Sequence, residues 1–566
     1  MQEKLWVYQN TDREKIKKIS EEYHIPKLVA ALLVNRDIEN ISYYLTKSMQ
    51  MVHHPNEMKD MKKGAARIAE AISSKENIVI YGDYDVDGIT STSLLYLFLK
   101  EQGATVSYYI PDRIEEGYGI NIMAVNKLAK KGAKLLITVD CGITSVGEVS
   151  LANALGMDVI ITDHHTCKEK VPEATAVINP KQPDCTYPFK GLAGVGVAFK
   201  LMLSVVMQLG LDTRTYFDRY VEIVALGTIA DVVPLIDENR IIADRGLISL
   251  SNTNREGLKA LLELSGFSDK PLTASSLAFS VCPRMNAAGR LGTAETAVKL
   301  LTTTSKEEAY EIARRLDEEN RNRQATEKQI LKEAMGQIAS DPDFAKKKVI
   351  VLYNPDWHHG VIGIVASRIC EQFYRPCILI TSDGTVGKGS GRSIASFNLF
   401  DALEHCSSLL TNFGGHAVAA GLGIMPEDIS AFTQEINVYA DSVLTEEDLI
   451  ARIFIDCEIS PIDVRLESAK LLTRLEPFGM GNPKPVFSLS QLSIASITRM
   501  GIEQKHLRLR LVSGTKSINA VGFHMGAYFS HFAIGDTVDI ACTMELNHFQ
   551  GTESVQLILK DIRKSI

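Results

Sequence analysis

The chain has 566 residues, of which 45% are hydrophobic and 23% are charged. At roughly 100 to 200 residues per domain, this length excludes a single compact core and indicates three or four domains. The 61 Lys and Arg residues against 69 Asp and Glu residues give a net charge of −8, so a polyanion would have to bind a local basic groove and not a uniformly positive surface.

Membrane association and disulfide bonding are not indicated by the sequence. No apolar run reaches the roughly 18 residues that a membrane span needs, and the segment MQEKLWVYQNTDREK lacks the apolar stretch of a signal peptide. The nine cysteines are scattered and form no Cys-x-x-Cys pair, which argues against a zinc knuckle. We therefore expect a cytoplasmic protein with reduced thiols.

The first half of the chain predicts an α/β domain. Residues 1–50 are expected to form a helical arm. From residue 51 to 244, β-rich runs then alternate with helical ones, and the β-rich runs read NIVIYGDYD, TVSYYIP, KLLITVDCG and DVIITDHH. Alternation of this kind is typical of right-handed βαβ units, and hence of a parallel sheet that helices cover on both faces.

The second half predicts three further regions. Residues 245–345 lose the strand signal and are expected to form a helical linker that ends in a long, charged helix. Residues 346–445 repeat a βα pattern and predict a smaller α/β domain. In residues 446–566 apolar and polar residues alternate, which favours a small antiparallel barrel resembling the oligonucleotide-binding (OB) fold. Its expected strands read RIFIDCEI, HLRLRLV, SINAVGF, DTVDIACTMEL and SVQLILKDI.

Acidic and histidine residues follow apolar runs at four places in the first domain. They are Asp83, Asp85 and Asp87 in YGDYDVDG, Asp140 in LLITVDCG, Asp163, His164 and His165 in VIITDHH, and Asp231 in LGTIADVVPL. The carboxyl ends of neighbouring parallel strands converge on one crevice, so these groups are expected to meet there.

Clustered carboxylates would repel one another unless divalent cations neutralised them. The number of ligands exceeds what one octahedral ion needs, which predicts two ions about 3.5 to 4 Å apart with a shared carboxylate. Asp140, alone at the end of a central strand, is the expected bridge. Mixed Asp and His ligands favour Mn²⁺, with Mg²⁺ as the alternative, and zinc is disfavoured because no cysteine joins the set.

A calcium loop is the alternative interpretation of Asp-x-Asp-x-Asp-Gly. Such a loop needs a bidentate Glu at its twelfth position, but counting from Asp83 that position is Leu94. Each of the four segments alone would more often be a turn or a helix cap. Their joint placement at strand ends favours the metal site.

These segments, in this order, resemble the signature motifs of the DHH phosphoesterase superfamily. They read DYDVDG, VDCG, DHH and TIADVVPL. The resemblance continues through PRMNAAGRLG at 283–292, and SGRS at 390–393 and FGGHAVAAG at 413–421 resemble the DHH-associated domain. The length of the chain, the long linking helix and the carboxy-terminal barrel make the resemblance specific to the RecJ branch of this superfamily. Its members are bacterial exonucleases that degrade single-stranded DNA from 5′ to 3′.

The resemblance implies roles for the acidic and histidine residues of these motifs in the first domain. The implied ligands of the two ions are Asp85, Asp87, Asp140, His164 and Asp231, with Asp140 as the bridge. Asp83 is a further candidate, since Tyr81 stands where other branches have a histidine. His165 would face the phosphate as a hydrogen-bond donor or acid, with a supporting role beside a ligand as the alternative.

Phosphate-binding candidates lie outside the metal motifs. In the second domain they are Arg392, Ser393, Gly414, Gly415 and His416, whose guanidinium, hydroxyl, imidazole and backbone N–H groups could bind a phosphate. Arg284, Asn286 and Arg290 in PRMNAAGR are candidates for contacts to the nucleic-acid backbone, with a helix cap and surface arginines as the alternative. In the last 100 residues Phe478, Phe487, Phe523 and Phe549 could stack on bases, although most are expected in the core.

Together these features and the resemblance predict a two-metal exonuclease that releases 5′ mononucleotides from single-stranded DNA, and the resemblance implies a role in recombination and repair. We expect a monomer in the cytoplasm, with single-stranded DNA and repair proteins as partners. A DHH-family phosphodiesterase acting on short RNA or cyclic dinucleotides is the alternative, but such relatives lack the barrel. A non-catalytic nucleic-acid clamp is disfavoured because the motif carboxylates and both histidines are present.

Overall fold

The computed structural model describes residues 4–9, 11–112, 116–117, 119–268, 270–291, 294–382, 384–549 and 552–565, without the side chains of residues 290, 291, 548 and 549. The chain divides into two compact units. The parallel-sheet unit comprises Ile38–Asn320 and Leu471–Lys484, and the barrel unit comprises Met1–Asp37, Arg321–Lys470 and Pro485–Ile566. Within the described ranges, no helix combines the length and the apolar character needed to cross a membrane.

The parallel-sheet unit contains a five-stranded sheet in which all neighbours are parallel. The strand order is β3 (Thr105–Tyr109), β2 (Asn77–Tyr81), β4 (Leu135–Val139), β5 (Asp158–Thr162) and β6 (Ala176–Ile178). The chain runs from β2 to β3 on one side and then to β4 on the other, so the order reverses between β2 and β4. In open α/β sheets such a reversal opens a crevice at the carboxyl ends of the strands.

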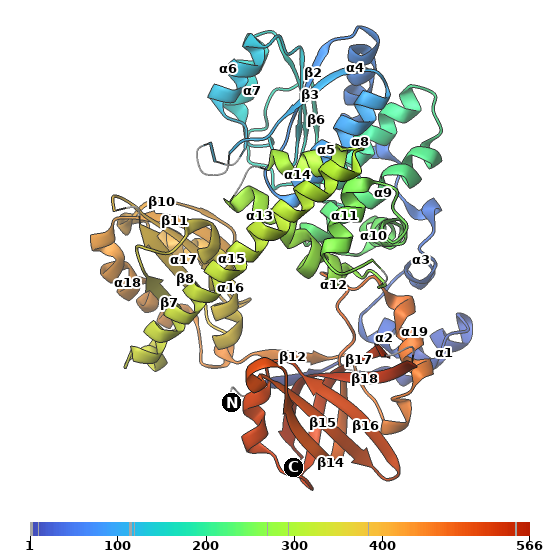
Figure 1. Cartoon of the computed structure of the whole chain (residues 1–566), viewed down its shortest axis with the longest axis vertical. Coiled ribbons are helices and arrows are strands. Elements are labelled where there is room, and N and C mark those ends of the chain that lie inside the picture. The colour runs from blue at the N-terminus through green and yellow to red at the C-terminus, as the bar shows by residue number, and fades with distance from the viewer. Residues whose placement is uncertain are drawn as a thin grey trace. The chain divides into compact units, whose positions relative to one another are not determined.

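Helices cover both faces of this sheet, which explains why the central strands β2 and β4 are apolar along nearly their whole length. Figure 1 shows α6 (Ile122–Lys130) and α7 (Val146–Ala154) on one side and α4 (Met61–Ser73) and α8 (Gly194–Gln208) on the other. Two separate hydrophobic cores fill these interfaces. The predicted doubly covered parallel sheet is confirmed.

The helices after the sheet form a third core instead of an extended connection. They are α9 (Thr213–Ala230), α10 (Asp237–Leu250), α11 (Glu256–Leu264), α12 (Ala274–Ser276), α13 (Cys282–Leu291) and α14 (Glu295–Thr302). Their apolar residues share this core with Val86 and Ile89 of α5 (Val86–Glu101). The region expected to be a linker, residues 245–345, therefore packs in large part on the α/β domain, and α15 (Lys306–Ser340) is the long helix that enters both units.

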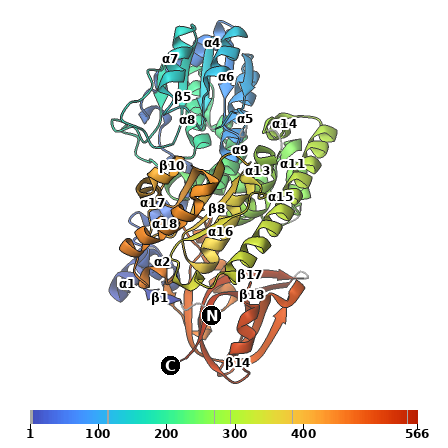
Figure 2. The same cartoon turned by 90° about the vertical axis from the view of Figure 1, so that its left-hand side faces the viewer.

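The barrel unit contains a second sheet, of order β10-β11-β9-β8-β7. Its strands are β7 (Ile350–Tyr353), β8 (Cys377–Ser382), β9 (Gly387–Arg392), β10 (Leu410–Gly415) and β11 (Ala419–Ile424). β7 and β8 pair in parallel, and the pairings β8–β9, β9–β11 and β11–β10 are antiparallel. Helices α16 (His359–Phe373), α17 (Leu399–His405) and α18 (Ile429–Val443) share its core, and α16 lies beside β8 in Figure 2.

The carboxy-terminal strands close into a five-stranded barrel. The strands are β14 (Phe487–Met500), β15 (His506–Ser513), β16 (Lys516–Gly522), β17 (Thr537–Phe549) and β18 (Thr552–Lys564). They pair in the order β14-β15-β16-β18-β17, and β17 pairs back with β14, which is the topology of an OB fold. The sequence pattern missed β14, because a bulge between Leu489 and Leu492, with Gln491 at φ 56°, interrupts the alternation.

The amino-terminal arm departs from the expectation of helices alone. Besides α1 (Arg13–Glu22) and α2 (Lys27–Asn35), it contains β1 (Leu5–Tyr8), which pairs in parallel with β12 (Arg452–Ile455). The Trp6 indole is buried and donates a hydrogen bond of 2.8 Å from Nε1 to Asp561 Oδ2 of the barrel. Residues 1–37 of the arm thus belong to the barrel unit, whereas residues 38–50 belong to the parallel-sheet unit.

Candidate metal centre

The predicted metal-binding residues all lie at the carboxyl edge of the parallel sheet. Asp83 and Asp85 follow β2, and Asp85 caps α5 by accepting hydrogen bonds from the backbone N–H groups of Asp87 and Gly88. Asp140 follows β4, and the two histidines follow β5. Asp231 caps the carboxyl end of α9. Residues separated by almost 150 positions are therefore brought to one crevice.

Asp140 adopts a backbone conformation that few residues tolerate. Its φ is 60°, in the left-handed region that Asp and Asn enter more readily than most side chains. Gly194, at the start of α8, packs so closely that a Cβ added there would lie 2.6 Å from Asp140 Oδ1. Both features place the Asp140 carboxylate within the crevice.

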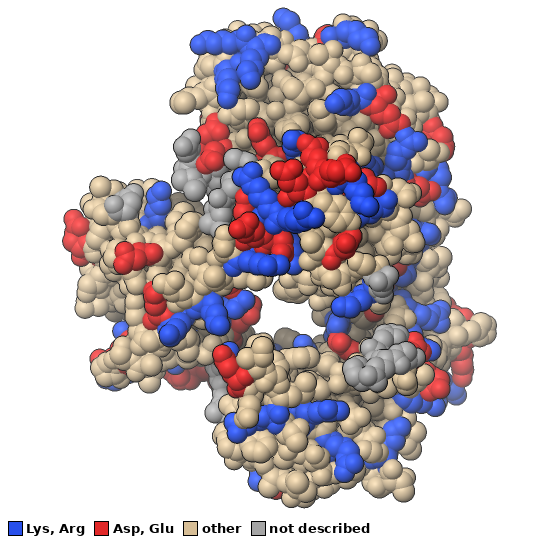
Figure 3. Space-filling model, viewed as in Figure 1, with Lys and Arg blue, Asp and Glu red and all other residues tan. Residues whose placement is uncertain are grey.

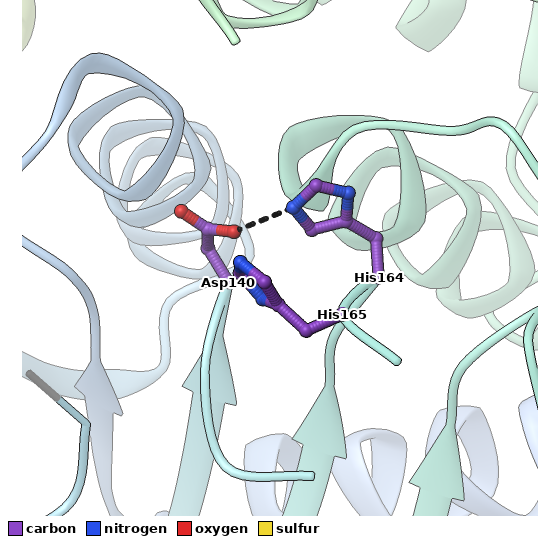
Figure 4. A group of neighbouring side chains, drawn as sticks. All are labelled: Asp140, His164 and His165. Atoms are coloured by element: carbon purple, nitrogen blue, oxygen red, sulfur yellow. Dashed lines mark ion pairs between the residues drawn. The ribbon is translucent and has the colours of Figure 1, made fainter. Parts of the chain in front are cut away.

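His164 stands among three carboxylates. Its Nε2 lies 3.2 Å from Asp140 Oδ1, 3.7 Å from Asp231 Oδ2 and 3.8 Å from Asp87 Oδ2. Figure 4 shows the imidazole facing Asp140 across the gap between the ends of β4 and β5. The Asp87 carboxylate is itself held by the backbone N–H groups of Gly194 and Val195, at 2.6 and 2.8 Å.

Three overlapping groups of side chains have ligand atoms within 4.8 Å of one another. The groups are Asp140, His164 and His165; Asp87, His164 and Asp231; and Asp83, Asp85 and Asp140. Asp140 belongs to the first and third groups, which is the arrangement expected of a carboxylate shared by two ions. Its bridging role and the liganding roles of the other residues remain predictions.

The electrostatics of the crevice favour bound cations. Burial, followed by repulsion from neighbouring carboxylates, raises the pKa of Asp87 to about 7 and of Asp231 to about 9, and the pKa of Asp140 well above its usual value. Burial lowers the pKa of His164 to about 3, so its imidazole is neutral and suited to metal coordination. Among the described side chains, the buried atoms His164 Nε2 and Asp231 Oδ2 have no hydrogen-bond partner. Divalent cations with oxygen and imidazole ligands fit this donor set.

Asp163 has a role that the sequence interpretation missed. It is buried and accepts hydrogen bonds from the backbone N–H groups of Ile143, His164 and His165, and its Oδ1 lies 2.7 Å from His165 Nδ1. Although burial opposes both shifts, this pairing lowers the pKa of Asp163 and raises that of His165. With Nδ1 held by Asp163, chemistry at the His165 ring would use Nε2. The position of Asp163 directly before two histidines was the available signal.

The residues of PRMNAAGR separate into different environments. Asn286 Oδ1 accepts a hydrogen bond of 3.3 Å from the backbone N–H of Val86, so it lies at the start of α5 beside Asp85. The Arg284 guanidinium instead pairs with Asp317 at 2.9 Å and donates to the backbone carbonyls of Ser280 and Leu264. These contacts favour a structural role for Arg284. The side chain of Arg290 lies outside the described residues.

The phosphate-binding candidates of the second domain lie in the barrel unit, on neighbouring strands. Gly414 and Gly415 end β10 and pair with β11, and the backbone N–H of His416 donates to Ala419 O at 2.8 Å. This glycine-rich stretch is thus a tight hairpin, and some of its backbone N–H groups already donate hydrogen bonds within the hairpin.

Arg392 is the last residue of β9, which pairs with β11, and Ser393 directly follows this strand. Arg392 Nη1 donates to Gly391 O at 2.7 Å, and a Cβ added to Gly363 of α16 would lie 3.2 Å from Arg392 Nη2. Ser393 Oγ donates to Phe397 O at 2.7 Å. Their phosphate-binding role remains a prediction.

The barrel aromatic residues lie in contrasting positions. Phe487 is fully buried and belongs to the core, whereas Phe523 is 53% exposed. The side chain of Phe549 lies outside the described residues, and Phe478 belongs to the parallel-sheet unit. Of the four candidates for base stacking, Phe523 is thus the exposed aromatic residue of the barrel.

Comparison with known proteins identifies three family domains. Residues 77–228 match the DHH family N-terminal domain, residues 346–441 match the DHHA1 domain and residues 455–561 match the RecJ OB domain. These ranges fall in the expected catalytic domain, second α/β domain and barrel.

Relatives and solved structures cover nearly the whole chain. The chain is 40% identical over 561 residues to the single-stranded-DNA-specific exonuclease RecJ of Bacillus subtilis, covering 98% of this chain and 70% of that protein. It is 34% identical to the Escherichia coli protein of the same name, covering 95% and 96%. The crystal structure of Thermus thermophilus RecJ in complex with Mn²⁺ superimposes with a TM-score of 0.86 at 31% identity, covering 99% of this chain and 80% of that one. The same RecJ has also been crystallised with Mg²⁺.

Proposed function

The chain belongs to the RecJ family, and we propose that it is a metal-dependent exonuclease that degrades single-stranded DNA from the 5′ end in recombination and repair. It releases 5′ mononucleotides. The observation that carries this proposal is the buried cluster of carboxylates around the neutral His164, in which Asp140 belongs to two of the three potential ligand groups.

The carboxylates and the imidazole hold the metal ions in this proposal. The ligands are Asp85, Asp87, Asp140, His164 and Asp231, with Asp140 shared and Asp83 as a further candidate. When bound, Mn²⁺ or Mg²⁺ activates a water molecule for attack on the phosphorus and stabilises the developing charge. The backbone N–H groups of Gly194 and Val195 orient the Asp87 carboxylate for this task.

His165 acts on the scissile phosphate. Asp163 fixes the ring through Nδ1 and, against the effect of burial, raises the pKa of His165 above its usual value, which favours the protonated ring. Its Nε2 then hydrogen-bonds the phosphate or gives a proton to the departing 3′ oxygen. No nucleophilic side chain is required.

The barrel unit supplies substrate binding. Arg392, Ser393 and His416, with the glycines Gly414 and Gly415, bind the terminal 5′ phosphate and so set the direction of degradation. The exposed Arg508 and Arg510 of β15 and the exposed Phe523 offer phosphate contacts and base stacking on the OB barrel. Figure 3 shows several basic side chains on the face of the barrel where Figure 1 labels β15 and β16. We further infer a cytoplasmic monomer that works with other repair proteins.

Strands labelled at either end test this proposal. With Mn²⁺, a long single strand labelled at its 5′ end should release the label as a mononucleotide at the earliest times, whereas a 3′ label should appear last. A blunt duplex of the same sequence is the control and should resist cleavage. Early release of the 3′ label would contradict the direction. Faster hydrolysis of a dinucleotide than of the strand would favour the alternative, a phosphodiesterase of short substrates, against which the RecJ OB domain argues.

A further inference from the structure

A segment distant in sequence packs on the loop that follows Asp231. This segment, residues 475–484, which we call the clasp, belongs to the parallel-sheet unit although it directly precedes the barrel strands. The backbone N–H of Leu235 donates to Met480 O at 2.7 Å. Gly479 packs on Leu235 so closely that an added Cβ would lie 2.7 Å from Leu235 Cδ1. The clasp thus holds the chain four residues beyond Asp231.

The backbone immediately after Asp231 is strained. Val232 has a φ of 59°, in the left-handed region that a β-branched residue rarely enters. Such a conformation persists only where its surroundings hold it, and strain of this kind often occurs at functional sites. The chain beyond is held by the buried Leu235 and by Asn239, whose Nδ2 donates to Pro234 O at 3.0 Å. This strained turn directly follows Asp231.

The clasp is anchored by its own buried hydrogen bonds. Arg240 of α10 is 1% exposed, donates from Nη1 to Leu475 O at 2.8 Å and stacks 4.0 Å from the centroid of the Tyr44 ring. The Tyr44 hydroxyl donates to Asn482 Oδ1 at 2.7 Å, and Asn482 Nδ2 donates to Leu475 O and Pro477 O. The amide of Asn482 therefore closes the clasp on itself and ties it to α3 (Ile41–Thr46).

We propose that the clasp is a positioning element for the metal centre: by holding residues 234–236, it keeps Asp231 directed toward His164 and Asp87. This inference rests on the proposed function, in which Asp231 is a metal ligand. Gly479, Gly481 and Asn482 are the positioning residues. Gly481 has a φ of 70° and lies against Pro234 and Ile236, where an added Cβ would be 3.1 and 3.3 Å from their side chains.

Gly481→Ala tests the clasp, with Gly210→Ala as its matched control. Gly210 has the same φ of 70° in the same unit, but an added Cβ would meet no atom within 4 Å among the described residues. Both variants place an alanine at the same positive φ, but only the first brings its Cβ against Pro234 and Ile236 in the Asp231 loop. We expect Gly481→Ala to weaken Mn²⁺ binding about tenfold, measured by electron paramagnetic resonance on the full chain without DNA. It should lower kcat and leave KM for single-stranded DNA unchanged, whereas Gly210→Ala should match the wild type.

A wild-type Mn²⁺ affinity and kcat in folded Gly481→Ala would overturn the inference. If that variant does not fold, Tyr44→Phe decides, since it removes only the hydroxyl that binds Asn482: weaker Mn²⁺ binding supports the clasp, and unchanged binding overturns it. Asp231→Asn in the same titration separates the two proposals. If it leaves Mn²⁺ binding intact, the metal site itself is wrong; if it weakens binding and the clasp variants do not, only the positioning role is wrong.

Discussion

Two buried polar clusters in the parallel-sheet unit differ in how their charges are balanced. In one, Lys200 and Glu238 are each 0% exposed and pair at 2.5 Å between Nζ and Oε2. Lys200 Nζ also donates to His53 O, and Glu238 Oε1 accepts from the Tyr187 hydroxyl. Here the cation and the anion are both supplied by the chain, and hydrogen bonds satisfy much of what remains.

The metal centre has the opposite composition. Asp87, Asp140 and Asp231 surround an imidazole that burial keeps neutral, and repulsion among the carboxylates adds to burial in raising each pKa. Burying like charges without a counter-ion is costly, so such a crevice takes up protons or binds a ligand of opposite charge. A balanced buried pair is complete in itself, whereas an unbalanced cluster indicates a binding site.

Removal of the shared carboxylate is the strongest test of this contrast. Asp140→Ala should lower kcat by about a thousandfold or more, because several kcal/mol of transition-state stabilisation depend on correctly held ions. DNA binding should persist, since the barrel and its arginines are unchanged. The measurements are single-turnover hydrolysis in Mn²⁺ and strand binding in a gel-shift assay. Hydrolysis near the wild-type rate would contradict the assignment of Asp140.

A substitution in the buried Lys200–Glu238 pair should change the stability of the protein and leave its catalytic rate unchanged. Lys200→Met leaves Glu238 buried without its cation and should lower the free energy of unfolding by about 3 to 5 kcal/mol. The rate per folded molecule should stay near that of the wild type. Urea denaturation followed by circular dichroism measures the loss, and the double variant Lys200→Met/Glu238→Gln should recover part of it. If Lys200→Met lost activity without losing stability, the purely structural role of the Lys200–Glu238 pair would be contradicted.

The smallest expected effect is a change of melting temperature with pH in the protein from which the metal has been removed. In the unfolded chain Asp231 is deprotonated above about pH 5, whereas the folded, metal-free protein keeps this proton until about pH 9. The folded state therefore binds more protons between pH 7 and pH 9, and its stability falls as the pH rises through this range. We expect the melting temperature of the chelated protein to fall by a few degrees from pH 7 to pH 9. Saturating Mn²⁺ should raise the melting temperature and flatten the trend, and a melting temperature that rises with pH after chelation would argue against a protonated cluster.

Much of the metal centre was predictable because the strands of a parallel sheet can be recognised from short segments of sequence and their carboxyl ends lie at one edge. Apolar runs that end in Asp or His identify strand ends, and strand ends share one edge, so the placement of Asp140 and His164 at that edge followed from the pattern. Asp231 instead ends the helix α9, and its approach to His164 depends on tertiary packing. The residues that support the metal ligands were harder to predict from the sequence. Asp163 was recognised as part of a motif, but its hydrogen bonds to three backbone N–H groups depend on how the chain turns after β5.

Other features lay beyond any local pattern. Arg284 belonged to a motif-like run, yet its pairing with Asp317 is decided by the packing of α13 against α15. The bulge in β14 concealed the alternation of that strand, and β1 pairs with a strand more than 400 residues away. The clasp had no signal beyond its glycines and prolines. Each of these depends on contacts between segments whose relative positions only the folded chain defines.

By itself, the amino-acid sequence determined the fold class, the barrel and the identity of the acidic and histidine residues at the strand ends, because periodicity and strand ends are properties of short segments. The tertiary structure alone decided which carboxylates approach His164, which arginine is occupied by an ion pair and what holds the turn after Asp231. The physical reason is that burial and electrostatic coupling depend on distances across the fold, and long-range packing sets those distances.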